Sequence, residues 1–256
     1  MTADNFSLQA YFRRTGFGGS VSSDFETLRL MMRCQLFSVP FENLDVQAGK
    51  LVSLVPEDIF IKIVEHGRGG YCYEVNGLFA MALEAAGFTY RMIAARPMTY
   101  PVRRPKTHMA LVVEVDGTVW LVDLGFGSFG IREPMNLALT GREVRQENET
   151  FMLCMTADGS YLLRSFDGDS WRNLYEFTLQ PQEWVDFEPA NFLNSKHPDS
   201  IFVKGVMAVL QQPGGKIVLN GYQFKSVSEE GTECRTVCPG ELPALLRERF
   251  FLPYPV

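Results

Sequence analysis

The chain has 256 residues, of which 46% are hydrophobic and 21% charged, as is typical of a soluble globular protein with a sizeable core. The formal net charge of −6 argues against nucleic acid as a partner, because binding to phosphates needs a broad basic surface. No apolar run approaches the length needed to cross a bilayer, so we expect no membrane partner.

Residues 1–17 lack the basic-then-apolar layout of a secretory signal. The cysteines are odd in number and scattered, unlike those of a disulfide framework: Cys34, Cys72, Cys154, Cys234 and Cys238. The last two have C-x3-C spacing with no nearby histidine, which is not the pattern of a zinc site. We therefore expect a reduced, cytoplasmic protein without a metal.

Helical patterns dominate the first third of the chain. Residues 22–40 begin with a Ser/Asp start signal, carry apolar residues at helical spacing and stop at Pro40. Residues 56–67 begin with proline and two acids and stop at Gly67. A third helix is predicted from Cys72 to Gly87, with one apolar face made of Val75, Leu78, Phe79, Ala82, Leu83 and Ala86.

From about residue 90 the apolar period changes to two, which predicts strands. Turn residues separate short candidates at 90–96, 108–115, 118–123, 151–156 and 161–166. Residues 181–194 return to a helical pattern, and the tail adds strands at 216–220 and 222–227 and a helix at 241–250. Helices, then a run of antiparallel strands, then a mixed tail predict the α+β fold class.

Cys72 follows two glycines in the stretch "RGGYCYEVN" (68–76). Gly69 and Gly70 permit a tight turn and a close approach to a substrate. A cysteine at the start of a helix lies near the positive end of the helix dipole, which favours the thiolate. A buried structural thiol explains the same position equally well, so Cys72 alone does not decide between the two readings.

The stretch 107–127 predicts a hairpin with the two-residue turn Asp116-Gly117. In that register Ala110 faces Asp123, so His108 and Asp123 are diagonal neighbours on one face. A slip of one residue would separate them. A carboxylate beside a histidine fixes the imidazole and stabilises its cation, which in turn stabilises a cysteine thiolate.

Four motifs in this order resemble the arylamine N-acetyltransferase family: "VPFENLDV" (39–46), "RGGYCYEVN", "THMALVV" (107–113) and "VDLGFG" (122–127). The resemblance implies the catalytic triad Cys72, His108 and Asp123. It also implies three regions, an N-terminal helical bundle (1–88), a central antiparallel β-barrel (89–190) and a short C-terminal α/β lid (191–256).

The implied activity is transfer of an acetyl group from acetyl-coenzyme A, by way of an acetyl-cysteine, to an arylamine or arylhydrazine. The family's aromatic pocket positions fall on Phe41 and Phe126, which could equally be core residues. Glu42 and Arg68 are expected to form a buried ion pair beneath the loop before Cys72.

The glycine-rich stretch 125–130 includes Gly127 and Ser128, which either present amides to the coenzyme A pyrophosphate or form a plain turn. A short basic cluster, Arg103, Arg104 and Lys106, is compatible with a local anion site. The sequence leaves the oligomeric state open, a homo-oligomer included.

The sequence departs from the family pattern in two ways. Tyr73 and Val75 stand where phenylalanine and leucine are common, and the chain ends shortly after residue 250, where many members continue. A short end also resembles the amide synthases of this superfamily, which join an aryl amine to a polyketide acyl chain. A papain-like hydrolase and a binding module that retains the fold are more distant alternatives.

Overall fold

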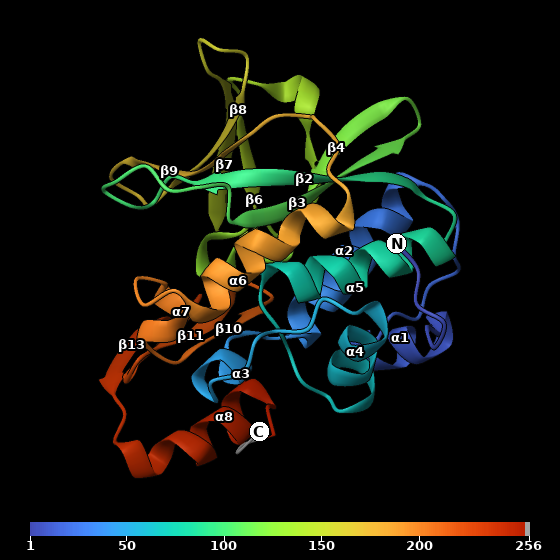
Figure 1. The fold of residues 1–256 in the computed structure, drawn as a ribbon. Coiled ribbons are helices and arrows are strands. Elements are labelled where there is room, and N and C mark those ends of the chain that lie inside the picture. Colours follow the sequence, from blue (N-terminus) through green and yellow to red (C-terminus); the bar gives the residue numbers. More distant parts are fainter. Residues whose placement is uncertain (254–256) are drawn as a thin grey trace.

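Helices form most of the first third of the chain in the computed structural model, which describes residues 1–253 (Figure 1). Their bounds are α1 Leu8–Thr15, α2 Phe25–Ser38, α3 Leu44–Gln47, α4 Pro56–Phe60 and α5 Cys72–Ala85. The helix expected over 56–67 is α4 followed by a π-helical turn, η1 Ile61–Glu65. The predicted start signal of α2 is present, because the Asp24 side chain accepts a hydrogen bond from Thr27 N.

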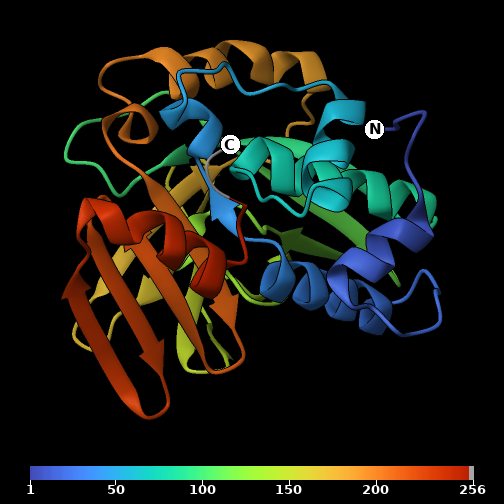
Figure 2. The same cartoon turned by 90° about the horizontal axis from the view of Figure 1, so that it is seen from below.

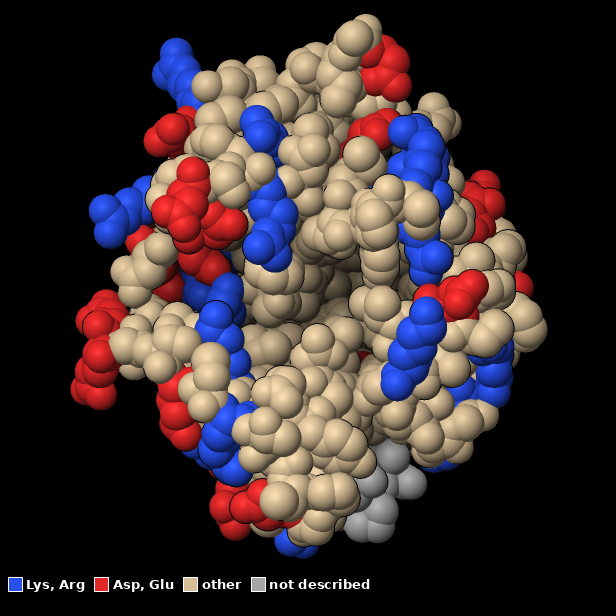
Figure 3. Space-filling model, turned by 90° about the vertical axis from the view of Figure 1, so that its left-hand side faces the viewer, with Lys and Arg blue, Asp and Glu red and all other residues tan. Residues whose placement is uncertain are grey.

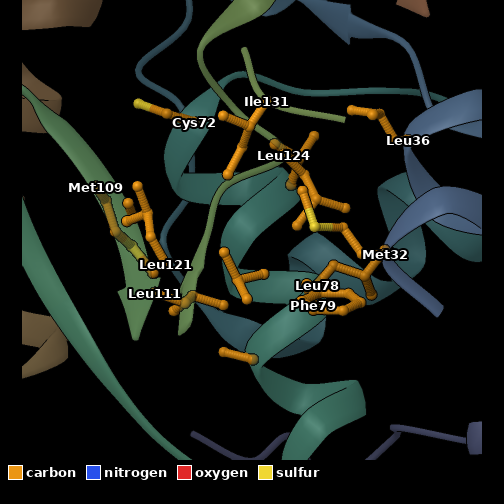
Figure 4. Close-up of a cluster of buried hydrophobic side chains, with 14 of the residues drawn as sticks. Met32, Leu36, Cys72, Leu78, Phe79, Met109, Leu111, Leu121, Leu124 and Ile131 are labelled. Carbon is orange, nitrogen blue, oxygen red and sulfur yellow. The ribbon is translucent and has the colours of Figure 1, made fainter. Parts of the chain in front are cut away.

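Helix α5 lies at the centre of the molecule. Every residue from Cys72 to Leu83 is buried, so burial around this helix extends beyond the residues predicted to share one apolar face. Figure 4 shows Leu78 and Phe79 of α5 beside Met32 of α2, near Leu111 and Leu121 of the neighbouring strands. A helix enclosed on all sides gives its first residue a fixed position, which matters for Cys72.

An eight-stranded antiparallel sheet, barrel-like in form, follows in the order β5-β4-β3-β2-β9-β8-β7-β6. Its strands are β2 Thr89–Pro97, β3 His108–Val115, β4 Thr118–Val122, β5 Met135–Asn136, β6 Glu143–Gln146, β7 Glu149–Met155, β8 Tyr161–Phe166 and β9 Trp171–Phe177. Sequence patterns did not indicate β5, β6 or β9. Short 3-10 turns occur at η2 Gly127–Phe129 and η3 Leu137–Leu139.

The chain then returns to helix and forms a second, five-stranded sheet. The helical elements are η4 Trp184–Phe187, α6 Glu188–Lys196 and α7 Ile201–Lys204. The strands are β1 Phe41–Glu42, β10 Met207–Gln212, β11 Gly215–Asn220, β12 Gln223–Ser228 and β13 Gly231–Thr236, followed by η5 Pro239–Glu241 and α8 Leu242–Phe250. Figure 2 shows α8 lying across this sheet, where Leu246 and Phe250 pack against Phe224.

The second sheet contains strands from both the first third and the last quarter of the chain. Phe41 of β1 pairs with Val209 of β10, so a segment of the helical region completes the carboxyl-terminal sheet. The α+β fold class is confirmed, whereas the boundaries at 88/89 and 190/191 remain a proposal. Among residues 1–253, no helix is long and apolar enough to cross a membrane.

Candidate active site

Cys72 is the first residue of α5, and only 3% of its surface is exposed. Tyr71 caps the helix, and its backbone N–H donates to the Glu74 carboxylate at 3.0 Å. The loop after β4 passes directly over this helix start. A Cβ added to Gly125 would lie 2.6 Å from the Cα of Cys72, so glycine is needed there for close approach.

His108 and Asp123 meet as the predicted hairpin register requires. Leu111 pairs with Val122, which places Asp123 just beyond the end of β4 and beside the start of β3. Nε2 of His108 lies 2.8 Å from Oδ2 of Asp123. The turn is tight because Asp116 and Gly117 both adopt positive φ, at 51° and 70°.

The second carboxylate oxygen of Asp123 is also occupied. Oδ1 accepts hydrogen bonds from Asn76 Nδ2 at 3.1 Å and from Gly125 N at 2.8 Å. Asn76 in turn accepts a bond from Leu124 N at 2.9 Å and donates to Met109 O at 2.8 Å. Asn76 therefore ties α5 to β3 and to the loop that follows β4.

Sequence reasoning missed Asn76, although a signal was present. An asparagine four residues after Cys72 lies one turn further along the same helix, within the otherwise apolar run 75–83. A buried amide must find hydrogen-bond partners, so its position marks a polar contact inside the core.

The two buried groups hold each other in their charged forms. Burial lowers the pKa of His108, but the attraction of Asp123 and hydrogen bonds to Asp123 and Cys72 outweigh burial and raise it to about 10. Burial raises the pKa of Asp123, and the charge of His108 with the hydrogen bonds described above brings it below its usual value. The arrangement therefore favours an imidazolium beside the sulfur of Cys72.

Two aromatic rings enclose the imidazole. The ring centroids of Phe126 and Tyr175 each lie 5.0 Å from that of His108. Tyr175 comes from the unpredicted strand β9 and is fully buried. Burial raises the pKa of its hydroxyl well above its usual value, and the nearby Asp123 carboxylate raises it further. Tyr175 therefore stays a neutral phenol, packed against His108.

The carbonyl of Thr107 connects α5 to the start of β3. It accepts hydrogen bonds from Tyr73 Oη at 2.9 Å and Asn194 Nδ2 at 3.0 Å, and the sulfur of Cys72 lies 3.9 Å away. Tyr73 thus uses a hydroxyl that a phenylalanine at this position would lack.

A cavity of about 220 Å³ contains Cys72 and His108. Phe41, Phe126, Gly127 and Ser128, the expected substrate and coenzyme positions, all line it. Arg104 of the basic cluster and Phe129 of the glycine-rich stretch also line it. Further walls come from residues that the sequence patterns did not mark: Tyr100, Leu193, Asn194, Phe202, Met207 and Val218. The site thus combines a buried triad with an opening of predominantly apolar, aromatic character.

The carboxyl-terminal sheet holds the loop that carries Phe126. Gln211 of β10 donates to the carbonyl of Gly127 at 2.9 Å, and Lys216 of β11 donates to the carbonyl of Ser128. Gly127 has a φ of 66°, which favours glycine at this turn.

Glu42 and Arg68 lie outside the cavity, in a buried cluster beneath the start of α5. Arg68 Nη2 is 2.7 Å from Glu42 Oε1. The pair also contacts Asp45 and Lys62, and Lys62 Nζ lies 2.6 Å from Glu74 Oε1. Burial raises the pKa of Glu74 to about 7, against the opposing charge of Lys62.

The preceding glycines make room for the chain itself, which corrects the expectation that they admit a substrate. A Cβ on Gly69 would lie 1.9 Å from the carbonyl of Pro40, and one on Gly70 would lie 2.6 Å from the Cβ of Glu74. Neither glycine lines the cavity. Within residues 1–253, no cluster of three or more His, Cys, Asp or Glu side chains is arranged to hold a metal ion.

The chain is similar to known proteins over most of its length. A family model described as N-acetyltransferase matches residues 24–254. Human arylamine N-acetyltransferase 1 is 31% identical over 88% of this chain and 90% of its own length. The arylamine N-acetyltransferase of Mycobacterium tuberculosis is 33% identical over 95% of this chain and 88% of its own.

Solved structures also match this chain over most of its length. The arylamine N-acetyltransferase of Salmonella typhimurium superposes with a TM-score of 0.91 at 28% identity, covering 96% of this chain and 90% of that one. The Mycobacterium marinum enzyme in complex with CoA superposes with a TM-score of 0.88 at 31% identity, covering 96% and 93%.

Proposed function

The chain belongs to the arylamine N-acetyltransferase family of acyltransferases, and from that premise we propose that it acetylates arylamines or arylhydrazines through an acetyl-Cys72 intermediate. The observation that supports this most strongly is the contact of His108 with Asp123 at 2.8 Å beside the buried sulfur of Cys72. An imidazolium held by a carboxylate stabilises a thiolate, which is the reactive form of cysteine.

In the first half-reaction, the Cys72 thiolate attacks the carbonyl carbon of acetyl-coenzyme A and forms a carbon–sulfur bond. The thioester bond to coenzyme A then breaks, and the His108 imidazolium gives its proton to the departing thiolate. Asp123 stays ionised and keeps the imidazole oriented throughout.

In the second half-reaction, the nitrogen of the aryl amine or hydrazine attacks the acetyl-Cys72 carbonyl. Neutral His108 takes the proton that this nitrogen loses, and the bond to Cys72 breaks to restore the thiolate and imidazolium pair. Phe41 and Phe126 contribute aromatic walls suited to a flat aryl acceptor. We assign Gly127 and Ser128 to the coenzyme A side of the cavity.

A panel of aryl amines and hydrazines, each offered with several acyl-coenzyme A donors, tests this function. We expect N-acetylation of at least one arylamine or hydrazine, and no product from the Cys72→Ala variant. A strong preference for long acyl donors over acetyl-coenzyme A would favour the amide synthase alternative. Hydrolysis that no amine accelerates would contradict acyl transfer to nitrogen.

A further inference from the structure

The loop between β2 and β3 carries the basic cluster of Arg103, Arg104 and Lys106, and the structure separates its members. Of the three, only Arg104 lines the cavity that holds Cys72. The side chain of Arg103 is 66% exposed and lies 3.9 Å from the Glu176 carboxylate. Lys106 is exposed. One cation of the cluster therefore faces the site.

Neutral groups hold the Arg104 guanidinium in place. Nη2 donates to the carbonyl of Asp199 at 3.2 Å, and the guanidinium carbon lies 4.9 Å from the ring centroid of Tyr100. The backbone is also fixed, because Arg96 donates to the carbonyl of Arg104. Within residues 1–253, no carboxylate forms an ion pair with Arg104, in contrast to Arg103. Its charge is therefore uncompensated.

The walls of the cavity strengthen the interaction of the Arg104 charge with an ion. Apart from Arg104 and the catalytic pair Cys72 and His108, every residue that lines the cavity is uncharged. Tyr100 lines the same cavity and is influenced by both groups: burial raises the pKa of its phenol, Arg104 lowers it and Cys72 raises it. A charge beside apolar walls interacts more strongly with an ion than the same charge in water.

We propose that Arg104 is an anion-binding residue of this cavity, which engages either a phosphate of the acyl donor or a carboxylate on the aryl acceptor. A carboxylate is a planar oxyanion and a phosphate is a tetrahedral one. Both accept paired hydrogen bonds from the N–H groups of a guanidinium. The identity of these two ligands rests on the proposed function, whereas the anion preference rests on the position of Arg104.

The face around the cavity supports the approach of an anion. Figure 3 views the molecule from the side of β9, α7 and β13 and shows a hollow near the centre of that face. Lysine and arginine side chains lie on both sides of the hollow. Clefts flanked by cations concentrate anionic ligands even in a protein with a negative net charge. An anion that enters the cavity then meets Arg104, the cation that lines it.

Binding measured by calorimetry tests the proposal without requiring turnover. Two pairs of probes differ in charge: coenzyme A against pantetheine, and 4-aminobenzoate against 4-aminobenzamide. The variants are Arg104→Met, which keeps the length of the side chain, Arg104→Lys, which keeps the charge, and Arg103→Met as the matched control on the same loop. Melting temperature verifies that each variant is folded.

We expect Arg104→Met to weaken binding of at least one anionic probe by about tenfold or more, with less than about a twofold change for its uncharged partner. Arg104→Lys should recover part of the loss, and Arg103→Met should bind as wild type does. The pair affected identifies the anion as donor phosphate or acceptor carboxylate. Equal changes within both pairs, or the same loss in Arg103→Met, would overturn the proposal.

The N-acetylation assay on wild type is evaluated separately. If wild type acetylates no amine but Arg104→Met still loses the anionic probe selectively, the proposed function fails and the anion site stands. If wild type is active and the charged probes bind Arg104→Met normally, the anion site fails and the proposed function stands.

Discussion

Gly125 lies so close to Cys72 that a methyl group on its α-carbon would stand 2.6 Å from the Cα of Cys72 and 2.9 Å from the side-chain Nδ2 of Asn76. The loop that follows Asp123 is thereby pressed against the first turn of α5. Cys72 and Asp123 belong to elements far apart in sequence, and this contact brings those elements against each other.

Gly125→Ala should therefore impair both stability and activity. The added methyl group must push the loop away from α5, at a cost of about 1–3 kcal/mol in the free energy of unfolding. Gly130→Ala is the matched control, because the nearest atom to its added Cβ is 3.6 Å away and its φ is −68°. Urea unfolding and the rate of Cys72 alkylation by iodoacetamide measure the two effects. Equal behaviour of the two variants would contradict the account.

Asn76→Ala should slow alkylation of Cys72, because Asp123 then loses the side chain that fixes it to α5. We expect a loss of about 1–3 kcal/mol in stability, since Leu124 N and Met109 O are left without their partner. Gln146→Ala removes another buried amide, on β6, which donates to Glu133 O at 2.9 Å and accepts a hydrogen bond from Arg132 N. It should lose stability to a similar extent and keep normal alkylation, and slowed alkylation in both variants would argue against a specific role.

The hairpin of β3 and β4 was predicted in its observed register, and the reason is local. A two-residue Asp-Gly turn admits one geometry, and alternation along each strand then decides which side chains share a face. The placement of His108 beside Asp123 follows from a stretch of only sixteen residues, 108–123.

Other features depend on contacts between distant segments and were not predictable in this way. β9 has the mixed sequence "WRNLYEF" and no clear alternation, yet it supplies Tyr175 beside His108. β1 is two residues long and exists because Phe41 pairs with Val209, far along the chain. Such strands are stabilised by their partners rather than by their own residues.

The stability of the folded protein should fall as pH rises from about 6.5 to about 10. Folded His108 has a pKa of about 10, whereas the unfolded chain releases the same proton near 6.5. In this range the folded state binds more protons, so raising the pH favours unfolding. The contribution of His108 is complete below pH 6.5 and is lost above pH 10.

Urea unfolding at several pH values, in wild type and Asp123→Asn, measures this dependence. Removing the carboxylate removes the main attraction that raises the His108 pKa, so the variant should show a shallower decline over the same range. Parallel stability curves for the two proteins would show that His108 is not held protonated by Asp123.

Gln211→Leu should raise the KM for the aryl acceptor while the alkylation rate of Cys72 stays normal. The change removes the hydrogen bond to Gly127 O and loosens the loop that carries Phe126, without touching the triad. Gln223→Leu, on an exposed position of β12 in the same sheet, is the control. An unchanged KM in Gln211→Leu would indicate that the turn itself is sufficient to hold the loop.

The central claim is that Cys72 carries the acetyl group between donor and acceptor. Intact mass spectrometry of the protein mixed with acetyl-coenzyme A, in the absence of any amine, measures this directly. We predict that wild type gains the mass of one acetyl group, that peptide mapping locates it on Cys72, and that an accepted arylamine removes it. Formation of N-acetylated product by wild type without any acetyl adduct on Cys72, or an equal adduct on Cys72→Ala, would contradict the account.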